Sequence, residues 1–162
     1  MGEFTLVVAA IASGLSAGLF YGWRVSVIPG TAQTSAAAYV ETMQRVNVAI
    51  INPAFLVVFM GVPVLVGLAA VVQFADDDTT AGTLLAVAVV VYLTTTVATT
   101  ATRNIPLNDA LDAFDLTGAS PEDVEAERAR YERPWNRWHD VRTVSSVVAF
   151  VLVVVAAVVR GG

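Results

Sequence analysis

The chain has 162 residues, of which 56% are hydrophobic and only 14% are charged, against about 25% charged residues in an ordinary soluble domain. A soluble fold of this size could not bury so much apolar surface, so the composition predicts an integral membrane protein with a single domain over residues 1–162. The chain has no cysteine, which excludes disulfides and thiolate metal sites. Its net charge of −5 argues against a nucleic-acid partner.

Four apolar runs are long enough to cross hydrocarbon, which takes about 20 residues. They cover roughly residues 4–23, 54–74, 82–101 and 141–159. Soluble amphipathic helices carry a polar face, whereas these runs contain long stretches with none. The predicted fold class is therefore all-α: a four-helix transmembrane bundle, antiparallel in up-down-up-down order, with short extra helices in the two long connections.

The arginines predict the orientation of this bundle. All nine basic residues are arginine, and eight of them lie in or at the border of the two long connections, residues 24–53 and 102–140. The short turn around Asp76 to Thr80 has no basic residue. By the positive-inside rule, both long connections are expected in the cytoplasm and both termini outside, in a multi-pass protein of the cell membrane.

Prolines and capping residues predict where the first two helices end and begin. Pro29-Gly30 is expected to stop the first helix. Ser35 is expected to cap a second helix, because its hydroxyl can accept a bond from a free backbone N–H. Pro53 lacks a backbone donor, so we expect a kink or break near Asn52.

The later boundaries follow the same signals. Asn104 is expected to cap a short helix that begins near Pro106 and ends before Gly118. Ser120, followed by a proline and two acidic residues, predicts another helix start. Pro134 is then expected to redirect the chain into the last span.

Small and hydroxylated residues within the spans are interpreted as packing features. Ala10, Gly14, Gly18 and Gly22 recur at four-residue intervals, which lets two helix backbones approach closely in lipid. The same spacing would serve contacts within one chain or between chains, so it leaves the oligomeric state open. The threonines at 94–102 are expected to bond back to their own helix.

Unusual polar chemistry gathers at one end of the predicted bundle. Trp135, Trp138, His139 and Arg142 share one helical stripe, because steps of three and four residues return to the same face. The same end receives six further residues: Tyr21, Arg24, Gln44, Asn47, Asn104 and Asn108. Taken singly, such residues often serve as interfacial anchors or helix caps. Clustered near hydrocarbon, they favour a bundle interior or cavity, and hence a ligand pocket.

Several of these elements also occur in a known family. They are Tyr21-Gly22-Trp23, Pro29-Gly30, Met43-Gln44 with Asn47, Asn52-Pro53, Asn104-Ile105-Pro106-Leu107-Asn108, and Trp135 with Trp138-His139 and Arg142. Together, over roughly residues 20–150, they resemble the anthrone-oxygenase-like family of small four-span membrane proteins. The resemblance implies oxidation of an anthrone-like or hydroquinone-like aromatic substrate by molecular oxygen, with neither metal nor flavin.

The residues permit a specific hypothesis for that reaction. His139, with a reference pKa near 6.5, would act as general base, and Arg142 or Arg24 would stabilise the developing oxyanion. Trp135 and Trp138 would stack on the substrate rings. The remaining candidates for substrate binding are Asn104, Asn108, Asn47, Gln44 and Tyr21.

Other functions are weighed beside this one. Common non-haem iron sites take two histidines and a carboxylate, and the chain has one histidine, so we expect no metal and no cofactor. A channel is disfavoured because no ionisable residue sits at the centre of a span. The main alternative is a non-catalytic membrane protein that binds a quinone or lipid headgroup or assists a larger assembly. The expected partners are the lipid bilayer, a small hydrophobic aromatic molecule and oxygen.

Overall fold

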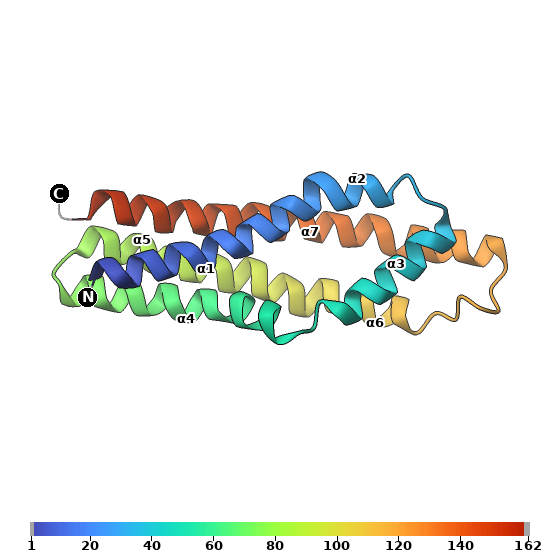
Figure 1. Cartoon of the computed structure of the whole chain (residues 1–162), viewed down its shortest axis with the longest axis horizontal. Coiled ribbons are helices and arrows are strands. Elements are labelled where there is room, and N and C mark those ends of the chain that lie inside the picture. The colour runs from blue at the N-terminus through green and yellow to red at the C-terminus, as the bar shows by residue number, and fades with distance from the viewer. Residues whose placement is uncertain (1, 161–162) are drawn as a thin grey trace.

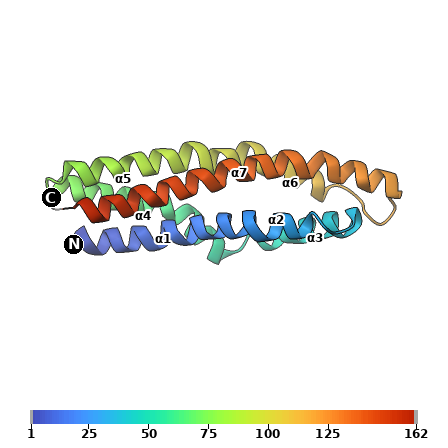
Figure 2. The same cartoon turned by 90° about the horizontal axis from the view of Figure 1, so that it is seen from above.

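The computed structural model describes residues 2–160, which form helices joined by short connections. In this range four helices are long and apolar enough to cross a membrane: Gly2–Thr31, Pro53–Ala75, Thr79–Asp112 and Pro121–Val159. They pack side by side in one elongated bundle, with the start of the first and the end of the last at the same end (Figures 1 and 2). The predicted all-α, four-span membrane fold is confirmed.

Two of the spanning helices are composite. The first joins α1 (Gly2–Gly22), the π-helical segment η1 (Trp23–Val27) and α2 (Ile28–Thr31). The third joins α5 (Thr79–Val91), two π-helical segments, η2 (Tyr92–Val97) and η3 (Thr100–Asn104), and α6 (Ile105–Asp112). The fourth, α7 (Pro121–Val159), is α-helical throughout.

An Ile-Pro pair explains two of the π-helical segments. Both η1 and η3 are followed directly by this pair, at 28–29 and 105–106. A proline removes one backbone donor, and its ring clashes with the carbonyl four residues earlier. A wider turn relieves the clash: the amides of Ile28 and Ile105 bond the carbonyls of Trp23 and Thr100, five residues back.

The first helix ends at Thr31, one residue beyond the expected stop at Pro29-Gly30. Two other expected boundaries are wrong. The third continues through Asn104, whose side chain makes no capping bond, to Asp112. The last helix continues through Pro134, because a proline costs one backbone bond and the buried Tyr131 and Trp135 on either side hold the turn in place.

The expected caps at Ser35 and Ser120 are confirmed, and Asn52 also caps a helix. The side chain of Ser35 accepts from the amide of Ala38 and starts α3 (Ala36–Ala49). Asn52 accepts from the amide of Phe55 at 3.0 Å and starts α4 (Pro53–Ala75). Ser120 accepts from the amide of Asp123 and starts α7. The α3–α4 break falls where Pro53 predicted it.

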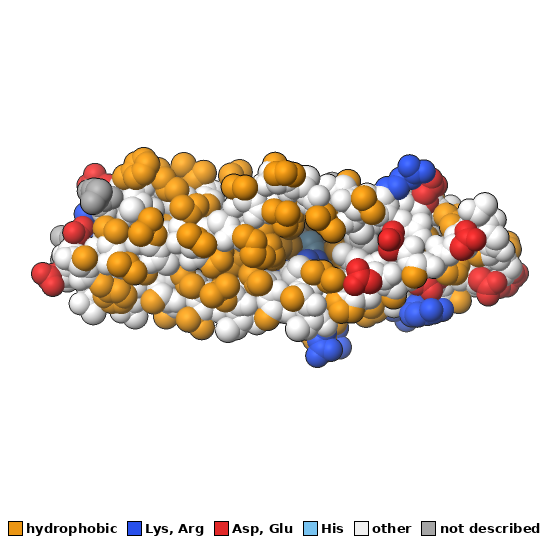
Figure 3. Space-filling model, turned by 90° about the horizontal axis from the view of Figure 1, so that it is seen from below, with side chains coloured by type: hydrophobic (Ala, Val, Ile, Leu, Met, Phe, Trp, Pro, Cys, Tyr) orange, Lys and Arg blue, Asp and Glu red, His pale blue; other side chains and the backbone are white. Residues whose placement is uncertain are grey.

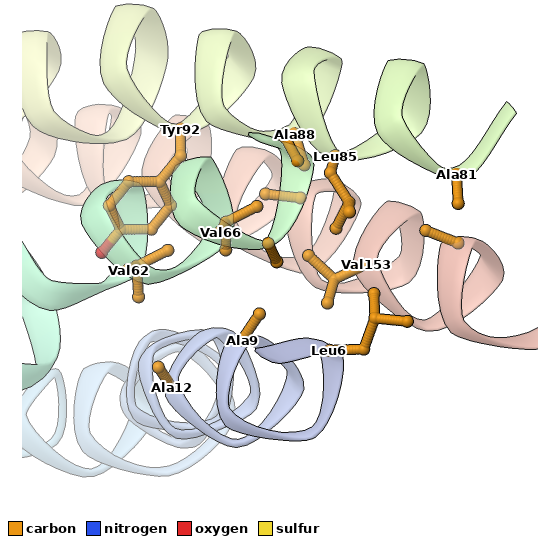
Figure 4. Close-up of a cluster of buried hydrophobic side chains, with 14 of the residues drawn as sticks. Leu6, Ala9, Ala12, Val62, Val66, Ala81, Leu85, Ala88, Tyr92 and Val153 are labelled. Carbon is orange, nitrogen blue, oxygen red and sulfur yellow. The ribbon is translucent and has the colours of Figure 1, made fainter. Parts of the chain in front are cut away.

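Small and branched apolar side chains fill the interior between the four spans. Figure 4 shows Ala9 and Ala12 of α1 facing Val62, Leu85 and Val153 from the other three spans. A second, smaller cluster lies at the other end of the molecule, where α3, α6 and α7 meet: Ala36, Tyr39, Val40, Met43, Leu111, Val124, Tyr131 and Trp135. The two clusters meet α7 on either side of His139.

Hydroxyl groups tie neighbouring spans together. The hydroxyl of Tyr92 lies 2.8 Å from Ser16 Oγ on α1 and donates to the carbonyl of Phe59 on α4 at 3.2 Å. Thr96 Oγ1 meets Ser145 Oγ of α7 at 2.8 Å. The expected back-bonding of the threonines is confirmed for Thr94, Thr95, Thr100 and Thr102, each to the carbonyl four residues earlier, and Thr96 departs from it.

The surface separates into an apolar length and a charged end. Large hydrophobic side chains are exposed along the four spans, and in Figure 3 they cover most of the visible face, whereas charged groups gather mainly toward one end. An exposed apolar surface of this extent fits a lipid environment. The chain is a membrane protein whose partner is the bilayer.

Candidate functional site

A cavity of about 300 Å³ lies between the spans, at the level where η1, η3 and the α3–α4 break approach α7. Its rim carries exposed apolar side chains, among them Leu19, Ile51, Leu56 and Met60. Figure 3 shows the face with this hollow, where apolar side chains surround an opening whose floor has the colours of histidine and arginine. The cavity therefore opens on the apolar surface of the bundle.

Stacked rings form one wall of the cavity. Tyr131, Trp135 and His139 follow one another at four-residue steps on α7, and their rings stack, with centroids 6.0 Å and then 5.0 Å apart. Trp23 of η1 lies against both Trp135 and His139. Phe20 of α1 also contacts the imidazole, with its ring tilted and 5.7 Å between centroids. An aromatic ligand in the cavity meets ring surfaces on α1, η1 and α7.

His139 has both ring nitrogens engaged. Nε2 lies 3.1 Å from the carbonyl oxygen of Phe20, and Nδ1 lies 3.2 Å from Nη2 of Arg142. A carbonyl can only accept and a guanidinium can only donate, so Nε2 carries the proton and Nδ1 presents its lone pair. The hydrogen-bond network thus assigns a neutral imidazole with a defined tautomer.

Arg142 is a buried cation at the polar end of the cavity, with 7% of its surface exposed. It donates to Thr100 Oγ1 at 3.3 Å and to His139 Nδ1, and its guanidinium carbon lies 5.2–5.3 Å from the ring centroids of Phe20 and Trp135. Within the described range no carboxylate forms an ion pair with it. Its Nε is buried without a hydrogen-bond partner.

Three asparagines reach the cavity from α3, η3 and α6. Asn104, 1% exposed, donates to the carbonyl of Trp135 at 3.3 Å, and its Oδ1 is buried with no partner. Asn108 Oδ1 accepts from the Trp135 indole at 2.8 Å and from the Tyr131 hydroxyl at 3.0 Å. Asn47 donates to that hydroxyl at 3.3 Å. The asparagines fix the aromatic wall and leave one free acceptor, Asn104 Oδ1.

Six of the ten predicted site residues line this cavity: His139, Arg142, Trp135, Asn104, Asn108 and Asn47. They come from the third and fourth spans and from α3, and sequence positions up to 95 residues apart meet here, from Asn47 to Arg142. The structure therefore brings together the imidazole, guanidinium and carboxamide groups that the sequence placed at one end of the bundle.

The other four predicted residues lie outside the cavity lining. Trp138 is half-buried beneath the guanidinium groups of Arg103 and Arg137. Arg24 pairs with Asp140 at 2.5 Å. The two remaining residues are Gln44, which donates to the carbonyls of residues 111 and 114, and Tyr21, which is 58% exposed.

Several residues of the site were not among the predicted ones. Four of them line the cavity: Phe20, Trp23, Phe59 and Thr100. A fifth, Tyr131, does not line it but stacks on Trp135 and so supports its wall. The four-residue steps from Tyr131 to Trp135 and from Thr100 to Asn104 were signals that could have identified two of them. Phe20 contributes a backbone carbonyl to His139, and no residue type marks such a role in a sequence.

The arrangement suits a flat aromatic molecule that carries an oxygen. Aromatic rings and aliphatic side chains line most of the cavity, and the guanidinium of Arg142 and the carboxamides of Asn47, Asn104 and Asn108 add polar groups to its lining. Among residues 2–160, no group of three or more His, Asp or Glu side chains is placed to hold a metal ion.

Comparison with known proteins gives one finding. The family model described as "Anthrone oxygenase" matches residues 55–152, which is more than half of the chain and includes five of the cavity residues predicted from the sequence: Asn104, Asn108, Trp135, His139 and Arg142. Neither the comparison with curated proteins nor that with solved structures gives a match. The match with the family model shows that this chain belongs to the anthrone oxygenase family.

Proposed function

We propose that this protein is a membrane-embedded oxidoreductase that oxidises an anthrone-like or hydroquinone-like aromatic substrate with molecular oxygen, without a cofactor. One observation carries the proposal: an apolar, ring-lined cavity of about 300 Å³ ends at the buried guanidinium of Arg142. Family membership supports the oxygenase class of reaction.

Substrate reaches the cavity from the lipid. A polycyclic ketone partitions into hydrocarbon, and the cavity opens between exposed apolar side chains such as Leu56 and Met60. The rings then pack against the ring edge of Trp135 and against the Phe20–Phe59 pair. The ketone oxygen accepts from the guanidinium of Arg142, at the Nη2 group that lies against His139 Nδ1 in this structure.

His139 is the proposed general base. Its Nδ1 accepts from Arg142 in this structure, so the lone pair is released when the substrate oxygen takes over that N–H. Nδ1 then removes a proton from the ring methylene, and the electron pair moves to the oxygen as an enolate that Arg142 stabilises. Oxygen adds to the same carbon, and the hydroperoxide loses water. In balance, one CH₂ group and one O₂ become one C=O group and one H₂O.

The position of the cavity also fits the proposed orientation. Residues 24–53 and 102–140 hold most of the arginines and lie toward the end of the bundle away from the two termini (Figure 1). These segments also supply lining residues of the cavity, among them Asn47, Asn104 and His139. We place this end in the cytoplasm of a cell-membrane protein, with residues 1–162 acting as one domain. The predicted roles of Arg24, Gln44, Tyr21 and Trp138 stay predictions, because these residues lie outside the cavity lining.

Oxygen consumption by the purified protein in detergent tests the function. Anthrone oxidises slowly without protein, so the rate in protein-free detergent is subtracted. The wild type is expected to consume one O₂ per anthrone, and His139→Ala and Arg142→Gln are expected to lose this activity while remaining folded. Arg45→Gln, which changes an exposed arginine paired with Glu41, is the matched control. Uptake by His139→Ala equal to wild type would remove the imidazole from the mechanism.

A second candidate is a non-catalytic receptor for a quinone or a lipid headgroup. It is favoured by one observation, that both nitrogens of His139 are already hydrogen-bonded and present no free base. Native mass spectrometry of the protein extracted in mild detergent separates the two functions. A retained quinone or lipid, together with no anthrone-dependent oxygen uptake, supports the receptor.

A further inference from the structure

The guanidinium of Arg142 lacks the partner that a buried cation needs. It is 7% exposed, and its partners among the described residues are all neutral: Thr100 Oγ1, His139 Nδ1 and the rings of Phe20 and Trp135. Burying a charge is costly unless an opposite charge or a full set of hydrogen bonds compensates. Cation–π contacts recover only part of that cost, and Nε has no acceptor at all.

The nearby acidic side chains do not supply the missing charge. Asp140, two residues before Arg142, pairs with Arg24. Glu127, which is buried nearer the start of α7, pairs with Arg130. His139 cannot contribute negative charge, since its neutral ring presents only a lone pair to Arg142. Over the described residues, the cavity therefore holds one positive charge and no negative charge.

We propose that the cavity binds its aromatic ligand as an anion, with a phenolate or enolate oxygen on the guanidinium of Arg142, which lines the cavity. A charged oxygen supplies the missing counter-charge. This inference deepens the proposed function and rests on it for the location of the site.

A measurable consequence concerns the ligand itself. A cation held close to an acidic hydroxyl stabilises the ionised form, so the pKa of the bound ligand falls. The drop expected for an opposite charge at contact distance is roughly 1–3 pH units. The apolar walls act in the opposite direction, because removing an anion from water raises its pKa. A lowered pKa in this cavity therefore requires Arg142.

The probe is 2-hydroxyanthraquinone, whose visible absorption changes when the phenol ionises, and its partner is 2-methoxyanthraquinone, which cannot ionise. The absorbance of the hydroxyl compound is titrated from acid to alkaline pH with excess wild-type protein, and separately in empty micelles of the same detergent. Arg142→Gln and Arg142→Lys are titrated in parallel. Arg137→Gln, which removes an exposed arginine from the same helix, controls for net charge.

The wild type and Arg137→Gln are expected to shift the phenol titration to lower pH than in micelles, Arg142→Lys to retain part of the shift, and Arg142→Gln to abolish it. Near neutral pH the phenolate is expected to bind about tenfold more tightly than the methoxy compound. A wild-type titration equal to that in micelles, a shift that survives in Arg142→Gln, or equal binding of both compounds would overturn the proposal. The first and third outcomes need no variant, so they stand even if Arg142→Gln does not fold.

These results are separable from the oxygenase activity. A lowered phenol pKa without anthrone-dependent oxygen uptake would support the anion site and contradict the proposed reaction. Oxygen uptake together with a phenol pKa equal to that in micelles would support the proposed reaction and contradict the anion site.

Discussion

The imidazole of His139 lies parallel to the indole of Trp135, one turn earlier on α7, with ring centroids 5.0 Å apart and 10° between the ring planes. The stack leaves the edge of the imidazole free, and both of its nitrogens use that edge, one toward Phe20 and one toward Arg142. Ring stacking and two directional hydrogen bonds together fix the orientation of the imidazole.

The tautomer of His139 is the first prediction. Long-range proton–nitrogen NMR is expected to show Nε2 protonated and Nδ1 with the chemical shift of an unprotonated nitrogen, because the Phe20 carbonyl only accepts and Arg142 only donates. In Arg142→Gln the signal of Nδ1 is expected to move, while Nε2 stays protonated. A protonated Nδ1 in the wild type would contradict the hydrogen-bond assignment.

The indole of Trp135 should stabilise the fold through its N–H as well as its rings. Trp135→Phe keeps an aromatic ring but removes the donor to Asn108 Oδ1, which lies at 2.8 Å. The expected loss is about 1 kcal/mol of unfolding free energy, measured by denaturant titration in detergent. Trp138→Phe is the matched control, since this indole lies at the surface of the bundle beneath two arginines. An equal loss in both variants would show that the Asn108 bond contributes nothing specific.

The hydroxyl of Tyr92 should couple α1 to η2. Tyr92→Phe removes the contacts with Ser16 Oγ and the carbonyl of Phe59, and Ser16→Ala removes the first of these alone. Hydrogen bonds between helices in membranes contribute on average about 0.6 kcal/mol. A double-mutant cycle of these two substitutions is expected to give a coupling energy of that size. Strict additivity would mean that the 2.8 Å contact is energetically neutral.

Alkaline pH should weaken the packing of α3 against α7. Burial raises the pKa of Tyr39 above its ordinary value, the charge of Glu132 adds to this, and Arg128 partly opposes it. A phenol whose pKa is raised by folding stabilises the folded state fully below its unfolded pKa, near 10, and this contribution is lost as pH rises beyond it. The unfolding free energy is expected to fall from about pH 10 upward.

Tyr39→Phe isolates this effect, because it keeps the ring that packs against Tyr131 and removes the ionising group. The decline of stability above pH 10 is expected to be shallower in the variant than in the wild type, and the two should run in parallel below it. Identical pH profiles across the whole range would show that folding does not change the pKa of Tyr39.

Local sequence was enough for the features that depend on a few neighbouring residues. Ser35 and Ser120 cap helices as expected, since a cap needs only a side-chain oxygen and a free amide one turn ahead. The same local reasoning was wrong at Asn104 and Pro134. The helix widens by one residue before Ile105-Pro106 and continues, and at Pro134 the buried Tyr131 and Trp135 hold the helix on either side of one lost backbone bond.

The composition and spacing of the chain by themselves determined that it is an all-helical membrane protein with its polar chemistry at one end, because hydrocarbon accepts only long apolar helices and expels charge toward their ends. Only the tertiary structure decided which groups meet. Helical spacing puts Trp135 and Trp138 on one stripe with His139, but the packing of α1 and η3 against α7 turns Trp135 inward and leaves Trp138 at the bundle surface. The contact of the Phe20 carbonyl with His139 and the lack of an acidic partner for Arg142 likewise depend on which distant segments pack together, and no single helix encodes this.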